Sequence, residues 1–483
     1  MTAGDLIAPA AGAAGSSGAG AARVRFNPFG AEFRCDPYPM YRQLREQRPV
    51  HRTLGMWVLS RYADVREVLR DRTFSAGVIP RQISRQAARL EVTDTGRVER
   101  LSLSSLVFTD EPAHGRLRAL VNHVFTATAI DGLRPGIAAT ADRLLAQAWA
   151  EGGVDASVSG GGSGGAEHQG EHGEEGGGER GDQGRMDAVA GFAAPLPVAV
   201  LCDWLGLPAE VRPHVAGWTH DIRFILEPGL MRPGDLVRVR EVLDEFMAVL
   251  GEVIADRRAR PGEDLISRLL AARTGGQDRL EDAEIAYVGV MCFVAGLETT
   301  TSLLGNTLLA LLTHPAQDAL MRRRPQLARA AVSEALRYDP PLQLTKRLAT
   351  RDVEIGGERI PAGAEVLLCL GATGRDPAVF ARPDEFDITR QAREHLAFGH
   401  GMHGCLGGAL ARAQVEIALE CLYRRSDLLR LASPAESPAT DRPAADRPAA
   451  GPGTNRGEGP SWQDHSFIIR GLTSLPVTLR GGS

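Results

Sequence analysis

The sequence predicts a mainly α-helical protein with minor β structure, and three observations support this prediction. Apolar residues recur at helical spacing, every third or fourth position, over residues 115–128, 134–150, 236–258 and 264–273. One unusually long apolar segment runs from Glu281 to Thr313 and stops before Pro315. Segments with a strand-like pattern are short and come late in the chain.

The long apolar segment predicts a central helix. At about 1.5 Å per residue it spans roughly 50 Å, and a helix that is apolar nearly all round must lie inside the protein. Another helix fits Pro325–Tyr338 and ends before Pro340-Pro341. A turn at Gly356-Gly357 divides the first of the predicted strand regions, which cover residues 352–361, 365–371, 466–471 and 476–480.

Low-complexity segments precede or interrupt what is otherwise a single domain over residues 26–483. Residues 1–25 are rich in Ala, Gly and Ser, so they are expected to be disordered. Residues 156–185 and 433–460 hold almost no large apolar side chains. They are therefore expected to be inserts that contribute nothing to the core.

Composition and charge exclude several classes of protein. A net charge of −5 and a pI near 6.2 give no electrostatic reason to bind nucleic acid or an anionic membrane. The six cysteines lack CxxC pairs, which argues against a disulfide framework and a Cys-rich zinc module. The N-terminal stretch lacks the pattern of a signal peptide, and no membrane anchor is expected. A soluble, cytoplasmic, monomeric protein is predicted.

The strongest chemical signal is the segment FGHGMHGCLG, residues 398–407. Its glycines let the backbone fold tightly around the Cys405 sulfur and turn amide groups toward it. A helix predicted just after Cys405 places its positive end near a thiolate. One alternative is a glycine-rich turn with an incidental cysteine, which requires a coincidence over ten positions. Another is a zinc site from His400, His403 and Cys405, which lacks a second ligand cluster.

A second motif is the pair Glu334 and Arg337 on the helix predicted over residues 325–338. Residues three apart share a helix face, so the carboxylate and the guanidinium can pair. Taken alone, such a pair is more often solvated at the surface.

A third motif, Ala295-Gly296-Leu297-Glu298-Thr299-Thr300, lies midway along the long apolar segment. Gly296 removes side-chain bulk from the helix surface at this point. The Thr299 hydroxyl can bond the carbonyl of Ala295, four residues earlier. For an isolated threonine, that local bond would be the preferred interpretation.

These motifs together resemble the cytochrome P450 family in its soluble bacterial, actinomycete-like form. The cysteine segment matches the family's haem loop, in order, at Phe398, Gly399, Gly401, His403, Cys405, Leu406 and Gly407. The likeness extends from about Asn27 to the final strand, outside the two inserts. It implies the P450 fold, with small peripheral sheets and the long helix crossing a b-type haem held by a thiolate.

The resemblance also implies which residues bind the cofactor. Cys405 would be the proximal iron ligand, and Phe398 the ring that shields its sulfur. Arg and His side chains suit the haem propionates, because they form charge-assisted hydrogen bonds with carboxylates. The residues expected to contact haem besides Cys405 and Phe398 are Ala295, Gly296, Gly407 and the propionate-binding His114, Arg118, Arg347 and His403.

Two further pairs take their roles from the same resemblance. Glu334 and Arg337 become a buried pair that holds the haem-side scaffold. Glu298 and Thr299 become the family's oxygen-activating acid and alcohol. Thr299 would stabilise the bound oxygen, and Glu298 would relay protons.

A hydrophobic organic substrate is expected, such as a polyketide, terpenoid or peptide intermediate of natural-product biosynthesis. Some lining candidates share the face of the oxygen motif, and others are analogous to lining positions in the family. These candidates are Met291, Val294, Leu344, Leu472 and Thr473. All are apolar or small.

The expected activity is insertion of one oxygen atom from O₂, with haem b as the cofactor. Because the chain has no flavin or iron–sulfur module of its own, a ferredoxin and a ferredoxin reductase are expected to supply electrons. They would dock on the cysteine side, near Arg412, Arg424 and Arg425. Oxidative coupling or desaturation remains an alternative, and a haem-binding protein without turnover is a weaker one.

Overall fold

The computed structural model describes residues 24–92, 94–151, 183–274, 278–432 and 459–481. The predicted N-terminal disordered segment and both low-complexity inserts fall almost entirely outside these ranges. The first insert ends earlier than predicted, because Gln183 already pairs with Arg480 in a sheet.

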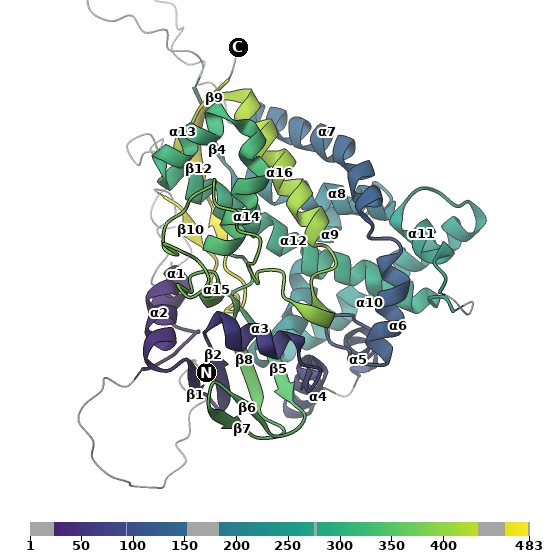
Figure 1. The fold of residues 1–483 in the computed structure, drawn as a ribbon. Coiled ribbons are helices and arrows are strands. Elements are labelled where there is room, and N and C mark those ends of the chain that lie inside the picture. Colours follow the sequence, from purple (N-terminus) through teal and green to yellow (C-terminus); the bar gives the residue numbers. More distant parts are fainter. Residues whose placement is uncertain (1–23, 93, 152–182, 275–277, 433–458, 482–483) are drawn as a thin grey trace, which may run out of the picture.

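The described chain is mainly helical, in agreement with the predicted fold class (Figure 1). The helices before the central one are α1 (Ala31–Cys35), α2 (Tyr38–Gln47), α3 (Tyr62–Arg70), α4 (Val78–Arg89), α5 (Gly96–Leu103), α6 (Ala113–Asn122), α7 (Ala127–Glu151), α8 (Pro195–Leu205), α9 (Arg212–Ile222), α10 (Pro233–Ala259) and α11 (Leu265–Ala271). The central helix and those after it are α12 (Asp282–Thr313), α13 (Pro315–Arg323), α14 (Ala328–Tyr338), α15 (Leu370–Thr373) and α16 (Gly408–Arg425).

Helix α12 forms the core, as its apolar composition predicts. It begins with a capping box between Glu281 and Glu284 and ends at Thr313, with His314 as the C-cap before Pro315. Helices α8, α9, α10, α14 and α16 pack around it. Among the described helices, α12 alone is long and apolar enough to cross a membrane, but two thirds of its most apolar stretch is buried inside the protein. It is therefore the core helix that the sequence predicts.

The strands form small sheets at the edges of the helical body. The largest sheet has the order β1-β2-β8-β5-β3, in which only the β2–β8 pairing is parallel. A second sheet has the order β4-β12-β9, and β6-β7 and β10-β11 are two-stranded. The strands are β1 (Val50–Thr53), β2 (Met56–Leu59), β3 (Phe74–Ser75), β4 (Gln183–Asp187), β5 (Leu344–Ala349), β6 (Val353–Ile355), β7 (Glu358–Ile360), β8 (Glu365–Cys369), β9 (Ser426–Leu431), β10 (Ser461–Trp462), β11 (Leu472–Ser474) and β12 (Pro476–Gly481).

Two predictions of local structure are wrong. The helix predicted over residues 115–128 is interrupted, because α6 ends at Asn122 and α7 begins at Ala127. Residues 466–471 form no strand, since the side chains of Gln463 and Ser466 bond their backbone. The strand-type pairing that the described part of this segment makes is one isolated bridge, from Ile469 to Leu342.

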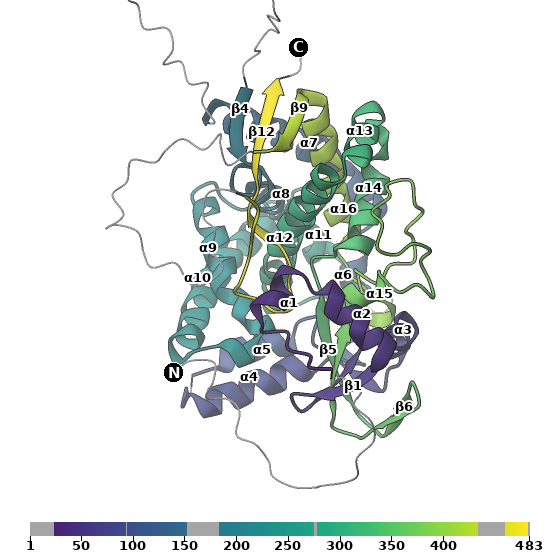
Figure 2. The same cartoon turned by 90° about the vertical axis from the view of Figure 1, so that its left-hand side faces the viewer.

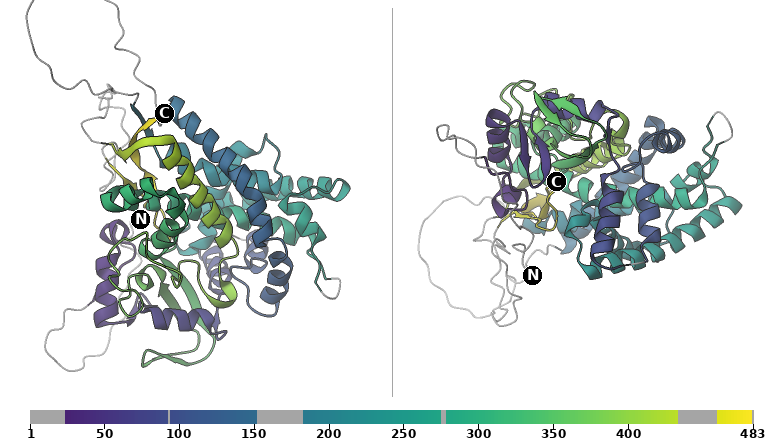
Figure 3. Two further views of the ribbon diagram at one scale, coloured as in Figure 1. Left: turned by 45° about the horizontal axis from the view of Figure 1, so that its top comes forward. Right: turned by 90° about the horizontal axis from the view of Figure 1, so that it is seen from below.

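The two larger sheets lie at opposite ends of the molecule. In Figure 2, β4, β9 and β12 gather at the top, whereas β1, β5 and β6 lie near the bottom. Seen from below in Figure 3, the green strands lie on one side and most teal helices on the other. Helices α7 and α16 run side by side, as Figure 1 also shows, and α16 packs against α12. Cys405 precedes α16, so its loop lies against the core helix.

Candidate active site between α12 and the Cys405 loop

An interior cavity of about 380 Å³ lies between α12 and the loop that carries Cys405. Its walls are mostly apolar side chains. Ala295, in the middle of the core helix, and Cys405 lie inside the protein, and both have accessible surface because they face this cavity. Gly296, Thr299 and Gly407 line it as well. The two motifs that the sequence predicts to flank a flat cofactor therefore lie on the walls of one cavity.

The Cys405 loop is held in shape by its own backbone. The Cys405 amide donates a hydrogen bond to the carbonyl of Phe398 over 2.8 Å. Gly399 and Gly401 have φ values of 69° and 71°, which side chains other than glycine rarely adopt. A Cβ atom on Gly401 would come within 2.7 Å of the Leu69 carbonyl oxygen. The glycines thus allow the tight fold of the loop, and Gly401 also lets it pack closely against α3.

The ionisation of Cys405 reflects two opposing influences. Burial is the larger and raises the pKa of the Cys405 thiol, whereas the amides of Gly407 and Gly408 and the charge of Arg118 lower it. The protein alone therefore does not give Cys405 the low pKa that the sequence leads us to expect, because burial outweighs the helix N-terminus. A coordinated metal cation deprotonates a thiol outright, so a thiolate here fits a metal-bound state.

Cationic groups lie on one side of the cavity. Arg118, Arg347 and His403 line it, and the His114 ring lies behind, 4.4 Å from the His403 ring. Both ring nitrogens of His114 and Nε2 of His403 are buried without a hydrogen-bond partner among the described residues. Burial lowers the pKa of Arg347 to about 10 and that of His403 to about 4. Buried donors without partners fit an acidic group of a cofactor, and the propionates of haem match them.

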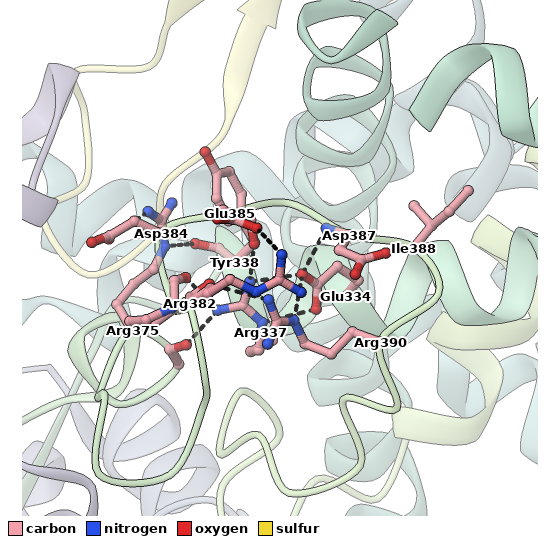
Figure 4. A network of polar contacts seen from close by, with 12 residues as sticks. Glu334, Arg337, Tyr338, Arg375, Arg382, Asp384, Glu385, Asp387, Ile388 and Arg390 are labelled. Atoms are coloured by element: carbon pink, nitrogen blue, oxygen red, sulfur yellow. Dashed lines mark hydrogen bonds and ion pairs between the residues drawn. The ribbon is translucent and has the colours of Figure 1, made fainter. Parts of the chain in front are cut away.

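Glu334 and Arg337 form a buried ion pair (Figure 4). Both side chains have no exposed surface, and the guanidinium donates to the two carboxylate oxygens over 2.8 and 2.7 Å. Arg337 also donates to the carbonyls of Gly374, Pro383 and Glu385. The pair therefore ties α14 to the segment that leads into the Cys405 loop. The surface alternative does not apply.

Thr299 lines the cavity, and its hydroxyl donates to the carbonyl of Ala295 over 2.6 Å. This is the local bond expected of an isolated threonine. Its position beside the cavity leaves the predicted role in oxygen activation open to the same side chain.

Glu298 is the neighbour of Thr299, but its side chain points elsewhere. Its Oε1 lies 2.7 Å from Nε2 of His465, and Glu298 is not part of the cavity wall. The His465 ring lies 5.9 Å from the ring of His220, which is exposed. A row of ionisable side chains thus connects Glu298 with the surface. His465 could not be found from the sequence, because no local pattern marks a contact across 167 positions.

The predicted substrate residues separate into two groups. Met291, Val294 and Leu344 line the cavity. The assignment of Leu472 and Thr473 is wrong, since Leu472 packs in the core beside Gly305, and the Thr473 hydroxyl bonds the Ser461 carbonyl. The part of that loop that does line the cavity is Phe467, Ile468 and Ile469. The sequence predicts a strand over these three residues, and that pattern gives no sign that they line a cavity.

The arginines predicted to attract a redox partner are largely occupied. Arg424 and Arg425 both pair with Asp142, at 3.3 and 2.6 Å. Arg412 lies over the Phe398 ring at 4.9 Å and contacts His395 over 3.1 Å. It therefore supports the ring beside Cys405 and has little freedom at the surface.

A zinc site is not supported. Among the described residues, no three His, Cys, Asp or Glu side chains are grouped closely enough to hold a metal ion. Nδ1 of His403 instead donates to the Leu106 carbonyl over 3.2 Å.

Comparison with known proteins agrees with this geometry. A family model described as Cytochrome P450 matches residues 231–435. Nocardicin C N-oxygenase from Nocardia uniformis subsp. tsuyamanensis is 34% identical over 420 residues, which cover 86% of this chain and 94% of that protein. The 6-deoxyerythronolide B hydroxylase from Saccharopolyspora erythraea is 31% identical over 456 residues, or 93% of this chain and 97% of that protein.

A solved structure is similar over almost the whole chain. The crystal structure of CalO2 has a TM-score of 0.76 and 33% sequence identity, and the match covers 95% of this chain and 100% of that chain. The likeness therefore includes both walls of the cavity.

Proposed function

The chain belongs to the cytochrome P450 family, and from this premise we propose that it inserts one oxygen atom of O₂ into a hydrophobic natural-product intermediate, with electrons from a ferredoxin and its reductase. It is an oxidoreductase of the monooxygenase class, and its cofactor is haem b. The observation that supports the proposal most is the cavity with Cys405 on one wall and the turn from Ala295 to Thr299 on the other.

Bound haem supplies the iron at which O₂ is reduced and its oxygen–oxygen bond is cleaved. Cys405 would ligate that iron, since it lines the cavity and its sulfur accepts hydrogen bonds from backbone amides at the α16 N-terminus. Arg118, Arg347 and His403 would hold the propionates. Phe398 would keep water from the sulfur, because its ring packs over Gly408 and under Arg412.

On the opposite wall, Thr299 and Glu298 would divide the handling of protons. The Thr299 hydroxyl lies at the cavity. It would give up its hydrogen bond to the Ala295 carbonyl and instead donate its proton toward the reacting oxygen. Glu298 would receive protons from His465 and pass them inward. The mostly apolar lining excludes competing water and favours a hydrophobic substrate.

The electron donor would dock on the surface outside the Cys405 loop. Arg66 and Arg70 on α3 are exposed. The pKa of His400 in that loop is lowered by burial and by the positive charges of these two arginines. Arg329 is also exposed. Burial and the positive charge of Arg329 lower the pKa of Arg412. An acidic ferredoxin suits this set better than Arg424 and Arg425, which are already paired. We therefore infer that the enzyme acts in the cytoplasm, as a monomer.

Reconstitution with isotopic oxygen tests the proposal. Purified holoenzyme is incubated with ferredoxin, reductase, NADPH and ¹⁸O₂, using candidate substrates that change the haem spin state. One ¹⁸O atom in each product molecule, formed only when ferredoxin and reductase are present, is the expected result. An oxidised product without ¹⁸O would indicate coupling or desaturation instead. Turnover with NADPH alone would contradict the expected electron supply.

A further inference from the structure

Lys346 is the single lysine among the 55 lysine and arginine residues of the chain. It lies in β5 and forms part of the cavity wall, next to Thr345 and Arg347. A lysine in the wall of a mostly apolar cavity is unusual, because a cation is costly to bury without a partner. The role of this residue is not accounted for by the proposed reaction.

Lys346 and Arg347 lie on opposite faces of β5, as consecutive strand residues do. Arg347 lies on the side of His403, whose pKa its charge lowers. The Lys346 ammonium lies 5.7 Å from the centre of the Phe467 ring. Phe467 belongs to the loop that lines the cavity beyond α12. The two cations therefore serve different parts of the site, and the propionate assignment of Arg347 does not extend to Lys346.

The charge of Lys346 lacks a direct partner. No carboxylate of the described residues lies within 4.0 Å of its Nζ, since no ion pair of Lys346 is found among them. The acids that act on it from further away are Glu365 and Glu227. Glu365 accepts from Gln82 over 3.0 Å, and Glu227 accepts from the Phe467 amide over 3.0 Å. Burial lowers the pKa of Lys346, as expected for an ammonium with incomplete compensation.

We propose that Lys346 binds a carboxylate of the substrate, so that the enzyme acts on amphipathic carboxylic acids whose apolar part lies against α12. This inference rests on the proposed function and names its substrate class. The Lys346 ammonium would gain the ion pair that it lacks, and the Phe467 ring would cover the pair. The mostly apolar remainder of the cavity, with Met291 and Val294, would accept the hydrocarbon part.

Matched probes test this inference in the holoenzyme. Straight-chain and cyclic carboxylic acids, each paired with its primary amide, are titrated while the haem spin state is followed. The best acid should bind about tenfold more tightly than its amide, the usual scale of a hydrogen bond to a charged group. Lys346→Met should abolish that preference with little change for the amide, and Lys346→Arg should retain most of it. Arg89→Met, at an exposed position of α4 outside the cavity wall, is the matched control for lost charge.

A second measurement does not depend on the haem spectrum. Reductive methylation can modify only Lys346 and the N-terminal amine, since the chain has no other lysine. Saturating acid should reduce methylation of Lys346 severalfold, as measured by mass spectrometry, and the amide should not.

Three results would overturn the inference: no binding of any acid, equal affinity within every pair, or a preference that survives in Lys346→Met. Spin-state changes with neutral compounds would persist in those cases, and the proposed monooxygenase function would stand. Failure of the proposed function is recognised differently: the reconstituted enzyme would form no product that contains ¹⁸O, whatever its affinity for acids.

Discussion

The two walls of the cavity are built in different ways. The wall that carries Cys405 comes from one short stretch of chain. In it the Phe398 carbonyl accepts a hydrogen bond from the Cys405 amide, and glycines with positive φ make the turn. The opposite wall combines α12 with the Lys346 face of β5 and with the loop around Phe467, segments that lie far apart in the sequence. The first wall would hold the cofactor in the same way for any substrate. The second wall would contact the parts of the substrate that vary from one compound to another. Substrate choice is therefore expected to depend on tertiary contacts between distant segments.

The largest expected effect lies behind the cysteine wall. Arg337→Met would remove the bidentate partner of the buried Glu334 and leave it only the weaker contact with Arg390, at 3.2 Å; breaking a buried pair costs about 3–5 kcal/mol in comparable cases. We expect loss of soluble holoprotein, measured as haem content and thermal unfolding. Arg382→Met is the matched control, since Arg382 pairs with Glu385 at the exposed end of the same segment. That change should cost less than about 1 kcal/mol. Similar losses in both variants would contradict the structural role of the buried pair.

On the opposite wall, Thr299→Ala should uncouple the reaction and leave the cofactor in place. The haem spectrum and substrate binding should persist, while product formed per NADPH falls severalfold and hydrogen peroxide accumulates. The substrate in this test should lack a hydroxyl near the reacting carbon. Thr299→Ser should retain coupling. Thr313→Ala serves as the control, because Thr313 makes the same type of bond to Leu309 at the exposed end of α12. Unchanged coupling in Thr299→Ala would leave Thr299 a locally bonded helix residue.

A smaller effect is expected one step further out, at His465. Removing its ring in His465→Ala takes away the ionisable group nearest to Glu298, so turnover should slow severalfold and its solvent isotope effect should increase. Glu298→Gln should slow the cycle at least as much. His214→Ala, an exposed histidine of α9, should change neither quantity. A normal rate in His465→Ala would show that protons reach the cavity by another route.

The smallest effect is expected from the first insert. Deleting residues 157–181 should leave haem content and folding intact, because loop closure depends only weakly on length, by about 0.6 kcal/mol per doubling. A longer deletion, of residues 157–184, also removes Gln183 and Gly184 from β4. It should lower the unfolding temperature further. Equal destabilisation by both deletions would show that the insert itself stabilises the fold.

The parts of the site that the sequence predicts are those encoded in short motifs. The Cys405 loop, the Glu334–Arg337 pair and the turn at Ala295–Thr299 each lie within a single stretch, and local backbone geometry determines their form. The α-helical architecture can be predicted in the same way, from apolar spacing and from the length of α12.

The remainder depends on which distant segments meet. His465 contacts Glu298, Lys346 faces Phe467, and neither contact leaves a local pattern. The prediction for Leu472 is wrong for the same reason, since the path of the last loop decides which of its residues reach the cavity. The pKa of Cys405 also could not be predicted, because burial is a property of the folded chain.

Thiolate ligation by Cys405 is tested most directly by the absorption spectrum of the reduced, carbon monoxide-bound protein. A strong Soret band at the red-shifted position typical of thiolate ligation is expected, since a thiolate donates more electron density to iron than imidazole does. Cys405→Ala should abolish that band. Cys292→Ala should keep it, although Cys292 lines the same cavity from α12. A band that survives in Cys405→Ala would contradict the central claim, because the iron would then have another ligand.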